Sequence, residues 1–218
     1  AGEEIHTDEF GRVRVQFHWD RYGNMDEMSS LWVPVNQPWA GGSMGAINIP
    51  RIGQEVMVSF LAGNPEEPMI MGRMYTNLNR PPYPLPAKKN INGFKSQETI
   101  GGTGKNELHF DDTKGEMRMY RHAGKNEDTE TVNNRTEWVG NDRTARVDKN
   151  RSSSIGGNDK KEVEGNETEQ IQGDQKHSVL GDKIGSVLGN LLQMTQGERI
   201  LQTIGNMVSS ALSHSISS

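Results

Sequence analysis

The chain contains no cysteine, and this absence excludes disulfide bridges, cysteine-ligated zinc sites and thiol nucleophiles. It also lacks an apolar run of roughly 18 residues and a signal-peptide pattern, so neither a membrane-spanning helix nor entry into the general secretory route is predicted. Hydrophobic residues make up 32% of the 218 residues and aromatic residues 6%. The net charge of −5 argues against a nucleic-acid partner. These features are typical of an elongated protein with a narrow hydrophobic core.

An eight-residue repeat runs from Val139 to Gly205. Its aliphatic column holds Val139, Val147, Ile155, Val163, Ile171, Val179 and Val187. A glycine column follows two positions later, at Gly157, Gly165, Gly173, Gly181, Gly189 and onward, and Asn or Asp usually comes next. Lys149 and Glu198 depart from these two columns. Fixed-period repetition is typical of a solenoid, and the even period keeps the aliphatic column on one face of a strand.

Each octad is therefore interpreted as one short strand and one bend. Glycine favours the bend because it accepts a positive φ, and Asn or Asp tolerates the left-handed region. The repeat predicts a β-helix, with the glycines at its corners.

The energetics of this repeat favour an oligomer. Most octads from Val139 to Val179 bury one aliphatic side chain, worth about 1.5–3 kcal/mol, whereas ordering eight backbones costs about 8–16 kcal/mol. A lone chain would also leave strand edges unpaired. We predict three intertwined chains with the aliphatic columns on a common axis; a monomeric roll is the alternative.

The N-terminal part has a different pattern. Five short strands are predicted over residues 12–19, 31–35, 46–49, 54–61 and 68–75. This pattern predicts a five-stranded OB-type barrel, or a related Greek key, over residues 1–78. A proline-rich linker over residues 79–97 follows, and two strands near 107–111 and 117–120 lead into a β-helix domain over 98–218. The fold class is all-β.

The aliphatic residues become denser towards the C-terminus. They recur every four residues from Leu180 through Leu192 and again from Ile200 to Ile216. This spacing fits a continued β-helix, which the persisting glycines favour, and it also fits an amphipathic helix over part of 199–213.

Several motifs together resemble the VgrG spike proteins of the type VI secretion system, which are relatives of contractile-phage tail spikes. The resembling segments cover residues 9–20, 32–35, 49–56, 72–75, 107–112 and the run from Val139. The resemblance implies a C-terminal fragment of a trimeric needle that pierces target-cell envelopes and carries effectors. It further implies a secretion tube and a tip-capping protein as partners, transient contact with the target membrane, and assembly in the donor cytoplasm before secretion.

Catalytic and metal-binding patterns are weak by comparison. Gly41 to Gly45 matches a nucleophile-elbow string around Ser43, yet a strand-like segment follows it where a helix is required. Asp111 and Asp112 form a carboxylate pair at a predicted turn, where aspartate is common. His214 is a weak metal candidate, because three copies facing a threefold axis could hold a metal.

We predict no enzyme and no cofactor. The alternative function is an extracellular fibre that binds or cleaves glycans. Such a fibre should carry paired acids and exposed aromatics, whereas the repeat region has only Trp138.

Overall fold

The computed structural model describes residues 2–198, and these residues divide into two units, residues 1–140 and the described part of 141–218. Within this range the regular elements are β-strands and one short 3-10 helix, η1 (Leu61–Gly63). The described part of the chain is therefore mostly β. No helix among these residues has the length and apolar character needed to cross a membrane. Residues 199–213, for which a helix was one alternative, lie outside the described range.

Two strand pairs lie in the N-terminal part. β1 (Ala40–Gly41) and β2 (Met44–Gly45) form a small hairpin, and β3 (Val56–Phe60) pairs antiparallel with β4 (Pro68–Arg73). β3 alternates half-buried and exposed residues, as its sequence predicts, with Val56, Val58 and Phe60 on the inner face. The predictions of strands over 54–61 and 68–75 are confirmed.

The small core of this part contains three buried side chains, Val13, Val33 and Ile70. Isolated backbone bridges join them: Val13 pairs antiparallel with Val33, and Val35 pairs parallel with Ile70. Residues 12–19 therefore contribute one isolated bridge and residues 31–35 contribute two, where longer strands were expected.

The closed barrel expected over residues 1–78 is not seen. Strand pairing among the described residues 2–78 is limited to β1–β2, β3–β4 and two isolated bridges, and side chains bind two of the main-chain N–H groups: Ser30 Oγ accepts the Val15 N–H at 2.9 Å, and Gln37 Oε1 accepts the Asn48 N–H at 3.1 Å. The strand expected over 46–49 is absent, because Asn48 makes this side-chain contact in place of a strand partner.

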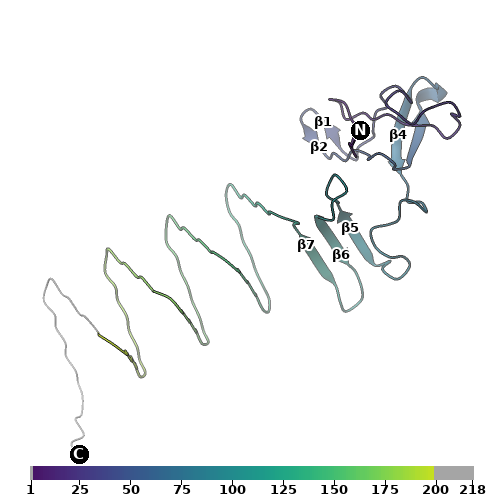
Figure 1. Ribbon diagram of the computed structural model, residues 1–218. Coiled ribbons are helices and arrows are strands. Elements are labelled where there is room, and N and C mark those ends of the chain that lie inside the picture. Colours follow the sequence, from purple (N-terminus) through teal and green to yellow (C-terminus); the bar gives the residue numbers. More distant parts are fainter. Residues whose placement is uncertain (1, 199–218) are drawn as a thin grey trace, which may run out of the picture. The chain divides into compact units, whose positions relative to one another are not determined.

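A three-stranded antiparallel sheet follows, in the order β5 (Ile91–Lys95), β6 (Glu107–Asp111) and β7 (Arg118–His122), which lie side by side in Figure 1. β6 and β7 confirm the two strands predicted here. The turn between them has Gly115 at φ 81°, a conformation that favours glycine. β5 was not predicted.

The described repeat has bends at a fixed interval. From residue 132 to residue 197 a two-residue bend recurs every eight residues, separated by extended segments, as the trace in Figure 1 shows. No strand pairing occurs between residues 123 and 198 of this single chain. The predicted period of one bend per octad is present, and the bends contain Gly157, Gly165, Gly173, Gly181 and Gly189.

Candidate functional site

The aliphatic column differs in exposure from its apolar neighbours. Each of its seven side chains from Val139 to Val187 is between 44% and 57% exposed. The adjacent Leu180 and Leu188, by contrast, are completely exposed. The column therefore forms one distinct apolar line along the repeat, and half of each side chain in it is left uncovered by the chain itself.

The bend glycines have a different conformation from the one predicted. Among the described glycines of the repeat only Gly197 has a positive φ, at 136°. The five bend glycines from Gly157 to Gly189 do not, so the positive-φ reason for glycine at these corners was wrong. A Cβ added at any of these five would also meet no atom of the chain within 4 Å. Neither backbone conformation nor crowding within one chain explains why they are glycine.

A buried carboxylate lies in the three-stranded sheet, which precedes the repeat in the sequence. Glu107, at the start of β6, is only 7% exposed. Its carboxylate accepts hydrogen bonds from Lys105 Nζ at 2.8 Å and from Tyr83 Oη at 3.1 Å, and His109 Nδ1 lies 2.7 Å away. The hydrogen bond from Lys105 is the main cause that lowers the Glu107 pKa to about 2, with His109 and Tyr83 adding to it.

The ring of Tyr83 fastens the proline-rich segment to this sheet. It meets the His109 ring edge-on at a centroid distance of 5.7 Å, and His109 stacks on Tyr120 of β7 at 4.9 Å. Burial and the hydrogen bond to Glu107 raise the Tyr83 pKa, so the phenol stays a proton donor. We name Tyr83, Lys105, Glu107, His109 and Tyr120 the Glu107 cluster. It joins three segments that are distant in the sequence.

A second set of polar contacts joins the N-terminal segment to the loop before β6. Arg51 Nη1 donates to Glu4 Oε2 at 3.2 Å, and Arg51 Nη2 donates to the Gln97 carbonyl at 2.5 Å. Glu4 Oε1 accepts the Gly101 N–H at 2.6 Å. These bonds tie residues 97–101 to the N-terminal part within the first unit.

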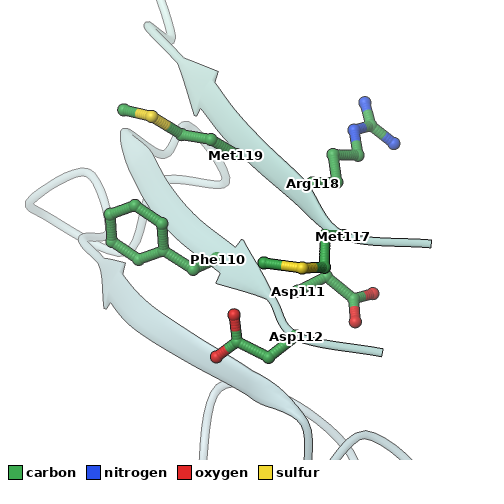
Figure 2. Close-up of a pocket in the computed structure, with 6 residues that line it drawn as sticks. All are labelled: Phe110, Asp111, Asp112, Met117, Arg118 and Met119. Atoms are coloured by element: carbon green, nitrogen blue, oxygen red, sulfur yellow. The ribbon is translucent and has the colours of Figure 1, made fainter. Parts of the chain in front are cut away.

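A shallow pocket of about 210 Å³ opens beside the β6–β7 turn, and Figure 2 shows its six lining residues. Asp111 and Asp112 both lie there, but their carboxylates point in different directions in Figure 2. Asp111 Oδ1 accepts from Thr113 Oγ1 at 2.6 Å, which lowers the Asp111 pKa, and Asp112 Oδ2 accepts from Asn92 Nδ2 at 2.9 Å. Both acids hold the turn and the sheet edge, and they do not form a shared acid–base pair.

Two other weak candidates from the sequence are Ser43 and His214. Ser43 lies in the turn between β1 and β2, at φ 57°, with a strand after it in place of the helix that a nucleophile elbow requires. His214 lies outside the described residues. In residues 2–198 no three His, Cys, Asp or Glu side chains come together as a metal site.

Two protein families match the chain. Residues 92–203 match the family described as the bacteriophage T4 gp5 C-terminal trimerisation domain, and residues 3–75 match the type VI secretion system/phage-baseplate injector OB domain. The first match takes in β5, β6, β7 and the described repeat. Neither description names an enzymatic domain.

Several characterised proteins are similar in sequence. The type VI secretion system spike proteins VgrG1b and VgrG1a of Pseudomonas aeruginosa are 50% and 48% identical over 141 residues, which is 64% of this chain and 19% and 22% of those proteins. The actin cross-linking toxin VgrG1 of Vibrio cholerae is 50% identical over 134 residues, 62% of this chain and 12% of that protein. The chain thus spans about a fifth or less of the relatives named here.

Proposed function

The chain belongs to the family of VgrG and gp5-like spike proteins, and from this premise we propose that it forms the shaft of a trimeric spike in a contractile secretion machine. The family's trimerisation domain implies a homotrimer. In this proposal the N-terminal part is an OB barrel, and the repeats of three chains wind into one triple-stranded β-helix. The spike is delivered through the type VI system, pierces the target-cell envelope and carries effectors.

The observation that carries the proposal is the half-exposed aliphatic column. The seven aliphatic side chains recur at a constant period, and each is exposed to about the same extent. Two further copies of the chain could therefore bury all seven on a common axis. The absence of strand pairing within the single repeat also fits, since the ladder hydrogen bonds then run between chains.

The bend glycines give independent support. Glycine is also selected where another backbone approaches closely. Because nothing in the single chain crowds Gly157 to Gly189 or gives them a positive φ, we infer that neighbouring chains of the trimer approach the backbone there.

We propose that the chain acts through stiffness and has no catalytic chemistry of its own. A bacterium whose copy of this protein carries Ser43→Ala or Asp112→Asn should kill neighbouring cells as efficiently as the wild-type bacterium does, because neither side chain belongs to a catalytic arrangement. Val163→Asp should abolish killing, because it places charge in the shaft core. The readout is survival of a competitor strain, with secreted protein measured in parallel. Loss of killing by Ser43→Ala or Asp112→Asn, with secretion unchanged, would contradict a purely mechanical role.

A further inference from the structure

Residues 19–31 of the first unit form a loop whose large apolar side chains face solvent. Each of these side chains is between 58% and 96% exposed, and they are Trp19, Tyr22, Met25, Met28 and Leu31. The Trp19 ring stacks on Phe17 at a centroid distance of 5.0 Å, and Phe17 stacks in turn on Phe60 of β3 at 6.2 Å. We name residues 19–31 the apolar loop.

Polar side chains hold the apolar loop in one conformation. Asp20 Oδ1 accepts the N–H groups of Tyr22 at 3.0 Å and Gly23 at 3.1 Å, and Asp26 Oδ1 accepts the Met28 N–H at 2.8 Å. The polar side chains of the loop thus bond to its own main chain, while its apolar side chains stay uncovered. Because the loop is already ordered, it loses little conformational entropy when a partner binds.

The composition of the loop is typical of a protein-binding surface. Tryptophan and tyrosine contribute most to the affinity of protein interfaces, and methionine adapts its shape to a partner. Met25 also has a φ of 55°, a conformation that costs free energy for a residue other than glycine, and its side chain gains no core contact in return because it is 83% exposed. Uncovered apolar surface and local strain together indicate a binding role.

The surroundings of the loop are acidic. Residues 1–87 contain ten Asp and Glu residues, six arginines and no lysine. Five of the arginines donate hydrogen bonds to other groups of the chain, namely Arg12, Arg14, Arg51, Arg73 and Arg80. Glu27 in the loop is exposed, as are Glu66 and Glu67 in the β3–β4 turn that follows Phe60. A partner with positive charge complements this surface.

The main chain of the loop indicates how the partner binds. The N–H groups of Tyr22, Gly23, Asp26, Met28 and Ser29 are all bonded within the loop. The loop therefore offers no free edge to which an extended peptide could add as a strand. A partner contacts its side chains, and an amphipathic helix makes such contacts with one apolar stripe.

We propose that the apolar loop binds a basic amphipathic helix of an effector that the spike carries. The apolar stripe of the helix covers the Trp19 ring, Met25 and Met28, and lysines or arginines beside the stripe face Glu27. The assignment of the partner as an effector rests on the proposed function, whereas binding of the helix by the loop does not.

The binding test uses the full chain and a dye-labelled peptide of repeated LKKLLKL heptads, followed by fluorescence anisotropy. Wild type should bind this basic peptide and should bind an acidic peptide of LEELLEL heptads at least about tenfold more weakly. Met25→Gln/Met28→Gln should bind the basic peptide about tenfold more weakly than wild type, because two apolar contacts are lost. Met117→Gln, at a methionine outside the loop that is as exposed as Met28, is the matched control and should bind as wild type. Equal binding of the two peptides, full binding by the double variant, or no binding by wild type would each overturn the proposal.

A charge variant tests the acidic side of the surface. Glu27→Gln should weaken binding of the basic peptide and make it less sensitive to salt, since screening acts only on charge interactions. Glu116→Gln, at an exposed glutamate in the β6–β7 turn, is its control and should leave both unchanged. Equal salt dependence of Glu27→Gln and wild type would contradict the charge complementarity.

Two further readouts separate this proposal from the proposed function. In the killing assay, Met25→Gln/Met28→Gln should reduce killing and leave secretion of the spike unchanged; unchanged killing would overturn the effector as the partner. The mass of each variant in solution is measured alongside, and a double variant that loses the trimer would assign the loop to contact between copies. A wild-type trimer that does not bind the basic peptide refutes the loop and leaves the spike standing, whereas a monomer that binds it refutes the shaft alone.

Discussion

Replacing Val163 with aspartate is expected to dissociate the trimer. The substitution brings three carboxylates around one axis in a dry interior, and an uncompensated buried charge costs about 3–5 kcal/mol. Lowering the pH should restore part of the assembly, because burial and mutual repulsion raise the pKa of such carboxyls and favour their neutral form. Sedimentation and thermal unfolding at neutral and acidic pH measure both effects.

Two control variants isolate the cause. Val163→Asn has a side chain of similar shape without a charge, so its effect should not depend on pH. Glu162→Ala removes the neighbouring side chain, whose ion pair with Lys160 is exposed, and should change stability by less than about 1 kcal/mol. Equal effects of Val163→Asp and Glu162→Ala would show that the column is not the axis of the shaft.

Replacing Glu107 with glutamine is expected to lower the free energy of unfolding of the first unit by about 2–3 kcal/mol. The reason is that a buried carboxylate which accepts bonds from Lys105 and Tyr83 is replaced by an amide that cannot pair with the lysine charge. Chemical denaturation followed by tryptophan fluorescence measures the loss. Glu127→Gln is the matched control: its ion pair with Arg121 is partly exposed, so the loss should be below about 1 kcal/mol.

The effect of Glu107 should depend on pH in a defined direction. Its folded-state pKa of about 2 lies below the ordinary value of 4.5, so its contribution to stability is complete above pH 4.5 and is lost as the pH falls towards 2. The difference between wild type and Glu107→Gln should therefore shrink across this window. A difference that stays constant from pH 7 to pH 2.5 would show that the Glu107 charge does not stabilise the fold.

Local patterns predicted the elements that depend on near neighbours. β6 and β7 follow from short strand-like segments on either side of the Asp112–Gly115 turn, and the eight-residue bends follow directly from the repeat. β5 escaped prediction because Asn92 and Gly93 disfavour a strand. The structure shows why glycine is present: a Cβ at Gly93 would lie 2.3 Å from the Leu108 carbonyl oxygen, so only glycine allows β5 to approach β6.

Features that depend on distant segments were not predictable in the same way. The Glu107 cluster needs Tyr83, 24 residues away, and the only sequence signal for it was the alternation of Lys105, Glu107 and His109 on one face of a strand. Closure of a barrel similarly depends on long-range pairing, of which the described residues 2–78 show only the β1–β2 and β3–β4 pairs and two isolated bridges. The period located the bend glycines correctly, but the positive φ that was predicted as the reason for glycine at these positions was wrong.

The measurement that tests the trimeric shaft most directly is the mass of the full chain in solution. Light scattering coupled to size exclusion at micromolar concentration should give about 73 kDa, three times the chain mass of 24.3 kDa, and Val163→Asp should shift this value towards the monomer. A wild-type mass near 24.3 kDa under the same conditions would contradict the account, because a single chain leaves its aliphatic column half exposed along the whole described repeat.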